Sequence, residues 1–260
     1  ALPAPAQAQD VLIRNARVHT LTTQGTLERA DVLVRGGRVV EVGSNLAAPG
    51  AQVTEANGRP LTPGLFGGIS GLGISEIELE SSTVDRAALV DSGASGPDFV
   101  PRPEFDVTQA FNPDSAVIGV NRAEGITFAM IAPMASGTLF AGQGAVARLD
   151  GSDSPFVAAS RTQFLDMGPS ATAGVGYSRG AQFMLLEQAT REALPGKPLQ
   201  AGDVRLLTPT GREVFARYLA GGRMAFAVDR AADIRQVVEF AARHGVRPVI
   251  AHPGAGVALN

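Results

Sequence analysis

The sequence contains neither cysteine nor tryptophan among its 260 residues. Disulfide bonds are therefore excluded, and cysteine usage gives no information about the cellular compartment. Two tyrosines and an aromatic content of 5% give little support to a stacking platform for sugars or bases. Only three histidines are present as candidate imidazole ligands for a metal.

Charged residues are also few, at 18% of the chain, and the formal net charge is −3. Because no basic patch or basic run with interleaved aromatics occurs, nucleic acid is not expected as a partner. Although 45% of residues are hydrophobic, no run approaches the roughly 18 consecutive apolar residues of a membrane span. The composition is that of a globular protein of one large or two ordinary domains.

The first nine residues are rich in alanine and proline, with small residues alternating at Ala6 and Ala8. This pattern, and the missing initiator methionine, are typical of a chain from which a secretory signal peptide has been removed. A frayed terminus or an artificial chain boundary is the alternative. The first interpretation predicts a periplasmic or secreted protein, with residues 1–9 as a signal-peptide remnant or a tail.

Residues 10–62 are expected to form a small β-domain, because they contain short β-rich runs and no convincing helix. The runs at 31–35 and 38–42 are separated by Gly36-Gly37, which predicts a hairpin.

Beyond residue 63 the pattern changes to strands that alternate with helices. Helices are expected to begin at Asn112-Pro113, at Thr208-Pro209 and at an Asp229 cap, and to end near Gly125, Gly221-Gly222 and Gly245; strands are expected at 126–133, 224–228 and 249–251. Short turns between such elements indicate a parallel α/β fold, which is either a closed barrel or an open doubly wound sheet.

Several motifs resemble the amidohydrolase superfamily, and in particular its secreted, imidazolonepropionase-like branch. Over about fifty residues the chain reads IRNARV at 13–18, VRGGRV at 34–39, EANG at 55–58 and TPGL at 62–65, in the order found in that family. Three later segments, at 121–127, 141–146 and 228–234, also look like family segments. The resemblance implies a composite β-sandwich domain at 10–62 and a TIM-type (β/α) barrel at 63–260, with room for about six of its eight strands.

In that family the first barrel strand carries an aspartate and a His-x-His metal pair, but here these positions are Gly67, Ile69 and Gly71. Alternate strand residues share a face, so two histidines there could reach one Zn²⁺ at about 2.0–2.1 Å. Isoleucine and glycine cannot donate to a metal. The fifth-strand ligand position corresponds to Ala227, so a second ligand strand is also emptied.

His252 is the remaining candidate metal ligand. It follows the strand expected at 249–251, at the end where barrel enzymes place catalytic groups, and the resemblance implies that it binds Zn²⁺ or Fe. The alternative is a polar strand-end residue and a protein without metal, because one histidine is far short of the three protein ligands of a catalytic zinc. His19 and His244 are interpreted as structural.

Glu76, Glu78 and Glu80 alternate and are expected to share one strand face. Such a cluster could raise a pKa for acid–base work or hold Ca²⁺, whereas a solvated edge strand is the alternative. Glu76 is the candidate catalytic residue, because it follows the first barrel strand. The whole segment 76–111 is rich in Ser, Asp, Gly and Pro and is expected to be a long loop over the barrel mouth.

Two glycine-rich runs, at 67–73 and Gly142-Gln143-Gly144, lack the spacing of a phosphate-binding loop, and Ser70 lacks the flanking glycines of a nucleophile elbow. Tight turns are the expected explanation of these glycines.

The resemblance implies a hydrolase that cleaves C–N bonds in a cyclic amide or related small molecule by metal-activated water. The alternative is a catalytically inactive amidohydrolase-like domain that binds a small molecule or packs against a partner. The incomplete barrel also predicts a homo-oligomer, or packing with the remainder of a longer chain, because exposed sheet edges need cover.

Overall fold

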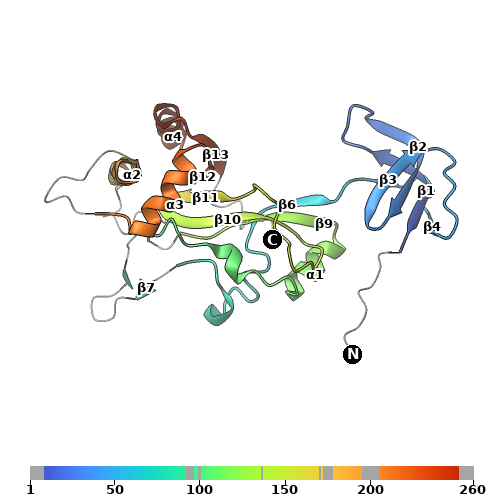
Figure 1. Cartoon of the computed structure of the whole chain (residues 1–260), viewed down its shortest axis with the longest axis horizontal. Helices are drawn as coiled ribbons and strands as arrows, with labels where there is room; N and C mark the ends of the chain where they lie inside the picture. The colour runs from blue at the N-terminus through green and yellow to red at the C-terminus, as the bar shows by residue number, and fades with distance from the viewer. Residues whose placement is uncertain are drawn as a thin grey trace. The chain divides into compact units, whose positions relative to one another are not determined.

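The computed structural model describes residues 9–88, 90–91, 97–98, 101–135, 137–169, 171, 178–194 and 205–251. The chain divides into two compact units, Ala1–Gly64 and Leu65–Asn260. Each unit is built around a sheet of its own (Figure 1).

The first unit is a five-stranded sheet with the order β3-β2-β1-β4, in which β5 also pairs with β1. Its strands are β1 (Val11–His19), β2 (Thr26–Arg35), β3 (Arg38–Gly43), β4 (Gln52–Glu55) and β5 (Pro60–Leu61). The predicted hairpin is confirmed, since Arg35 pairs with Arg38 across Gly36 and Gly37. Both glycines have positive φ, as a two-residue turn that follows the strand twist requires.

One face of this sheet is apolar, and Ala16, Val18 and Val32 are buried in its core. Asp31 is buried beside them because its carboxylate accepts hydrogen bonds from the backbone N–H groups of Asn15 and Leu46, each at 3.0 Å. The described residues of this unit form a single sheet, and the composite sandwich stays a prediction.

The second unit contains a six-stranded sheet with the order β13-β12-β11-β10-β9-β6 (Figure 1). Its strands are β6 (Leu65–Ser70), β9 (Ile126–Ile131), β10 (Phe140–Arg148), β11 (Thr162–Asp166), β12 (Arg223–Ala227) and β13 (Arg247–Ala251). β6 is parallel to β9, and β11, β12 and β13 are parallel to one another.

The predicted parallel α/β arrangement does not hold at β10, which runs antiparallel to both β9 and β11. Residues 132–139 and 149–161 contain no helix in their described part, so neither connection supplies the crossover that parallel neighbours need. The sheet is therefore part of a barrel interrupted by one reversed strand.

Four helices accompany this sheet in the part of the chain that the structure describes: α1 (Ala116–Ala123), α2 (Arg179–Ala193), α3 (Pro209–Leu219) and α4 (Ala231–His244). α3 begins as predicted, with Pro209 in its first turn and the Thr208 hydroxyl accepting the Gly211 N–H at 2.9 Å. α4 ends as predicted, at Gly245 in the left-handed conformation.

Two helix starts differ from the prediction. α1 is capped at Ser115, because Asn112 closes a turn with its side chain, accepting the Asp114 N–H at 3.0 Å. α4 is capped at Arg230 rather than Asp229.

The largest buried cluster lies between the helices and β11 and β12, with Phe215, Phe226 and Phe240 almost wholly buried. A second cluster around Ile74, Ile118 and Ile131 packs α1 and the chain after β6 against β9. Each large side chain contributes about 2–3 kcal/mol through burial. None of the described helices is long and apolar enough to cross a membrane.

The segment 76–111 is mostly irregular in its described part, as predicted. Its regular pieces are the short helices η1 (Ser81–Thr83) and η2 (Val107–Ala110) and the two-residue strands β7 (Val90–Asp91) and β8 (Pro97–Asp98).

Candidate functional site

The carboxyl ends of β11, β12 and β13 lie in one row, because Asp166 is in register with Ala227 and Ala227 with Ala251. This is the edge at which barrel enzymes carry catalytic groups. Ala227 offers the edge only a methyl group. His252 follows Ala251 but lies outside the described residues, so its role as a metal ligand stays a prediction.

Asp166 is a carboxylate at this edge that sequence reasoning missed. It is buried, and its Oδ1 accepts the N–H of Gly168 at 2.7 Å. The signal was available, because an apolar run ending in a single aspartate at residues 164–166 is typical of a strand that delivers a carboxylate to a sheet edge.

The end of β6 is filled by apolar contacts where the resemblance implies metal ligands. Ile69 packs against the buried cluster that includes Ala132, Phe164 and Ala225. A Cβ on Gly67 would lie 2.7 Å from Cγ2 of Ile126, so an aspartate there would require the Ile126 side chain to move.

Arg86 occupies the space beside the second histidine position. A Cβ on Gly71 would lie 2.8 Å from Cδ of Arg86, whose guanidinium pairs with Glu78. Glu78 in turn accepts the hydroxyl hydrogen of Ser75 at 3.0 Å. The Arg86 side chain thus occupies this space, and the Glu78 carboxylate offsets its charge.

A metal therefore does not fit the first- and fifth-strand positions that the resemblance implies. Ile69, Gly71 and Ala227 have no side chain that donates to a metal, and the Arg86 side chain fills the space beside Gly71. Among the described residues, no group of three or more His, Cys, Asp or Glu side chains could hold a metal ion.

The prediction that Glu76, Glu78 and Glu80 share a strand face is wrong, because residues 76–80 form turns closed by a Glu80 N–H to Ile77 carbonyl bond of 2.9 Å. Glu80 caps η1 by accepting the Ser82 N–H. Glu76 is exposed and accepts a long, 3.5 Å hydrogen bond from the side chain of Asn112. Its catalytic role stays a prediction.

The two described histidines make local contacts. Nδ1 of His19 lies 3.0 Å from the hydroxyl of Thr26 on the paired strand. His244 ends α4, and its Nε2 lies 3.0 Å from Oε2 of Glu187 on α2. Burial raises the pKa of Glu187, but hydrogen bonds from Arg243 and His244 outweigh it and hold this pKa below its ordinary value. Both histidines thus have structural partners.

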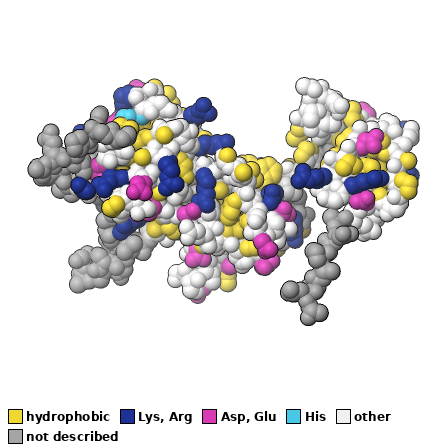
Figure 2. Space-filling model, in the orientation of Figure 1, with side chains coloured by type: hydrophobic (Ala, Val, Ile, Leu, Met, Phe, Trp, Pro, Cys, Tyr) yellow, Lys and Arg dark blue, Asp and Glu magenta, His cyan; other side chains and the backbone are white. Residues whose placement is uncertain are grey.

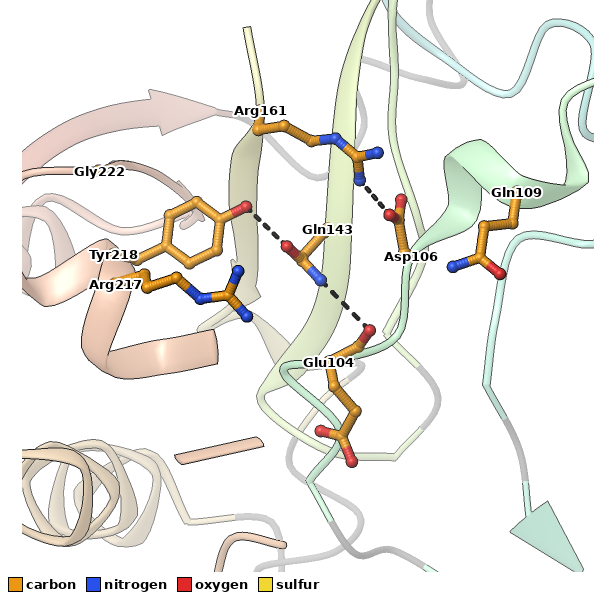
Figure 3. Close-up of a pocket in the computed structure, with 8 residues that line it drawn as sticks. All are labelled: Glu104, Asp106, Gln109, Gln143, Arg161, Arg217, Tyr218 and Gly222. Carbon is orange, nitrogen blue, oxygen red and sulfur yellow. Dashed lines mark hydrogen bonds and ion pairs between the residues drawn. The ribbon is translucent and has the colours of Figure 1, made fainter. Parts of the chain in front are cut away.

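A cavity of about 550 Å³ opens at the amino ends of β11 and β12 (Figure 3). Its walls come from the segment around η2, from β10, from the residue before β11, and from the end of α3 with the turn into β12. The lining residues are Glu104, Asp106, Gln109, Gln143, Arg161, Arg217, Tyr218 and Gly222.

Gln143 lies at the centre of the hydrogen bonds in this cavity. Its Oε1 accepts the phenol hydrogen of Tyr218 at 2.9 Å, and its Nε2 donates to the Glu104 carbonyl at 3.2 Å. Burial is the main cause that raises the pKa of Tyr218; the charge of Arg161 acts against it. The phenol therefore keeps its proton at neutral pH.

The glycines on either side of Gln143 belong to β10, so their prediction as tight-turn residues is wrong. A Cβ on Gly142 would lie 2.7 Å from the Phe105 carbonyl oxygen, and one on Gly144 would lie 2.1 Å from that of Ile131. These glycines allow the strand to approach two backbones closely. A Gly-Gln-Gly run within an apolar stretch was the signal for this cavity.

A search against protein-family models finds no match. An imidazolonepropionase from Klebsiella pneumoniae (strain 342) is 40% identical over 66 residues, which are 24% of this chain and 16% of that protein. The crystal structure of an amidohydrolase from Thermotoga maritima MSB8 aligns with 92% of this chain and 63% of its own, with a TM-score of 0.73 and 23% identity.

This chain thus spans less than two thirds of either protein. A dihydroorotase structure aligns with a TM-score of only 0.37, which is too low to carry weight. The match to the Thermotoga structure shows that this chain shares the fold of part of that protein.

Proposed function

We propose that this protein is a hydrolase of the amidohydrolase superfamily that cleaves a C–N bond in a cyclic amide or related small molecule, with an altered or reduced metal site. The observation that carries the proposal is the shared fold over 92% of the chain with the Thermotoga amidohydrolase. The local identity to an imidazolonepropionase supports the same substrate class.

The described residues limit how such a reaction would run. β6 and β12 supply no metal ligand at Ile69, Gly71 and Ala227, so the proposed chemistry depends on groups elsewhere, of which His252 is the candidate ligand. Asp166 at the end of β11 is a buried carboxylate at the same edge, and a carboxylate there could orient a water or a ligand.

The test combines metal analysis with a hydrolysis assay on the purified full chain. Stoichiometric Zn²⁺ or Fe, together with turnover of at least one cyclic amide or dipeptide from a panel, is the expected result. His252→Ala should remove both. His19→Ala is the matched control, because His19 belongs to the other unit and its ring hydrogen-bonds to Thr26 there, so it should leave both unchanged.

A second candidate function is a catalytically inactive amidohydrolase-like domain that binds a small molecule or packs against a partner. The observation that favours it is Arg86, whose side chain fills the space beside Gly71 and pairs with Glu78. Metal-free protein without hydrolysis across the panel would establish this candidate and refute the first. Stoichiometric metal lost on His252→Ala would refute the second.

A periplasmic or secreted location is a further proposal, and it rests on the small-residue pattern of residues 1–9. Fractionation of cells that make the natural protein would test it, and recovery only from the cytoplasm would contradict it.

A further inference from the structure

The cavity at the amino ends of β11 and β12 has a place of its own in the fold. Arg161 directly precedes β11, and Gly222 directly precedes β12. Asp166 and Ala227 end the same two strands, so the cavity opens at the end of the sheet away from the proposed hydrolytic edge. Binding in it does not depend on hydrolysis.

The centre of the cavity is fixed before any ligand enters. The backbone N–H of Gln143 donates to the Phe105 carbonyl at 2.6 Å, and its side chain bonds to Glu104 and Tyr218. A carbonyl oxygen can only accept, so the amide nitrogen of Gln143 faces Glu104 and its oxygen faces Tyr218. An oriented polar wall of this kind loses little entropy when it binds a ligand.

The hydroxyl oxygen of Tyr218 can still accept a hydrogen bond. Its single hydroxyl hydrogen is donated to Gln143, so its oxygen can only accept from a ligand. The ring of Tyr218 packs directly against Gly222, where an added Cβ would lie 2.6 Å from Cδ1 of the ring. A ligand at this oxygen must bring an N–H or O–H donor.

Most carboxylate oxygens around the cavity have partners among the described residues, and the one without a hydrogen bond, Oε2 of Glu104, is buried. One oxygen of Asp106 accepts from the backbone N–H and hydroxyl of Thr108, at 3.1 and 2.7 Å, and the other pairs with Arg161. The carboxylate of Glu104 points away from the centre, toward Thr208, whose hydroxyl donates to it at 2.7 Å (Figure 3).

Arg217 carries a positive charge at the cavity that is not part of the Arg161–Asp106 ion pair. Its Nε donates weakly to the Glu213 carbonyl at 3.4 Å, and in the described part of the chain its terminal nitrogens have no partner. Its guanidinium points toward Gln143 across the cavity (Figure 3). Basic and acidic side chains are interspersed on the face of the second unit that Figure 2 draws. A guanidinium with free terminal nitrogens binds a carboxylate through two parallel hydrogen bonds.

We propose that this cavity binds a small organic carboxylate that also carries an amide N–H. Its carboxylate pairs with Arg217 and its N–H donates to the oxygen of Tyr218. The neutralised Arg161–Asp106 pair forms the opposite wall and excludes a second charged group.

N-acetylglycine is a suitable probe, because it carries one carboxylate and one amide N–H. Levulinate has the same heavy-atom chain with a methylene group in place of the N–H, and N-acetylglycinamide has the N–H without the carboxylate. Titration of each compound against the full chain, monitored by ligand-observed NMR, should give a millimolar dissociation constant for N-acetylglycine and binding at least tenfold weaker for the other two compounds.

Variants of Arg217 and Tyr218 test whether N-acetylglycine binds in this cavity. Arg217→Gln should weaken N-acetylglycine binding at least tenfold, while Arg235→Gln, an exposed arginine on α4, should leave it unchanged. Tyr218→Phe should remove the preference for N-acetylglycine over levulinate. Because Arg217 is exposed, its variant tests the proposal even if Tyr218→Phe does not fold.

Three outcomes would overturn the proposal: no binding of N-acetylglycine at about 50 mM, well above the expected millimolar dissociation constant, equal binding of levulinate by the wild-type protein, or unchanged binding by Arg217→Gln. None of these bears on the hydrolysis assay, so failure of one proposal can be told from failure of the other.

Discussion

Replacing Gly144 with alanine should destabilise the second unit strongly, whereas the same change at Gly119 should stabilise it. Gly144 lies in β10, where an added Cβ would be 2.1 Å from the Ile131 carbonyl oxygen and 3.0 Å from Cε2 of Phe164. Gly119 lies within α1, where an added Cβ would meet no atom within 4 Å. The two substitutions differ only in their surroundings.

The stability cost of Gly144→Ala depends on which atom must move to make room for the added methyl group. A carbon–oxygen contact of 2.1 Å is more than an ångström too short, and the oxygen belongs to the backbone of the neighbouring strand β9, so no side-chain rotation relieves it. Overpacking that displaces backbone costs about 3 kcal/mol, at the upper end of the usual range. At Gly119, alanine should add about 0.5–1 kcal/mol, because glycine loses more backbone entropy in a helix.

Urea unfolding followed by far-UV circular dichroism measures both effects. With an m-value of about 2 kcal/mol/M, the midpoint of the second unit should fall by about 1.5 M for Gly144→Ala and rise by about 0.3–0.5 M for Gly119→Ala. Gly144→Ala should also weaken N-acetylglycine binding, since it displaces the strand that carries Gln143. A Gly144→Ala midpoint within about 0.2 M of wild type, an order smaller than expected, would refute the assigned strand packing.

Three further perturbations test other parts of the fold. Thr208→Ala should lower the free energy of unfolding by about 1 kcal/mol through loss of the α3 cap, and Thr208→Ser should restore most of it, as urea midpoints would show. Asp233→Asn should cost about 2 kcal/mol, because the buried carboxylate accepts two hydrogen bonds from Arg230, at 2.7 and 2.8 Å. The hydrogen bond from Arg230 lowers the pKa of Asp233 below its ordinary 3.8. The stability that the Asp233 carboxylate contributes is therefore present above pH 3.8 and is lost as the pH falls through the folded-state pKa. Asp233→Asn should show a smaller loss of stability in acid than the wild-type protein, and an unchanged acid profile would contradict the assignment. Phe226→Ala should cost about 3–5 kcal/mol, because this ring is wholly buried, and a thermal midpoint near wild type would contradict that burial.

Local sequence signals predicted the elements whose ends are decided within a few residues. Gly36-Gly37 specified a two-residue hairpin, Thr208-Pro209 the start of α3, and Gly245 the end of α4. In each case the boundary is set locally: the three glycines adopt positive φ, while the Thr208 hydroxyl accepts a backbone N–H and Pro209 lacks one. The start of α1 was missed because Asn112 can close a turn with its side chain as well as cap a helix.

Other features depended on contacts between distant segments. α2 was not predicted, since polar residues such as Gln182 and Thr190 are buried in it through hydrogen bonds that sequence periodicity does not show. The alternating glutamates at 76–80 suggested a strand, but Glu78 and Glu80 bond instead to Arg86 and Ser82 and hold turns.

The sequence by itself indicated, through an ordered set of local motifs, the fold that this chain shares with part of the Thermotoga amidohydrolase structure, and it showed that Ile69, Gly71 and Ala227 have no side chain that donates to a metal. Only the tertiary structure decided the reversed direction of β10, the place of Arg86 beside Gly71, and the cavity around Gln143. The physical reason is that a strand's direction and a cavity's walls are set by pairing between residues far apart in the chain, which local propensity does not encode.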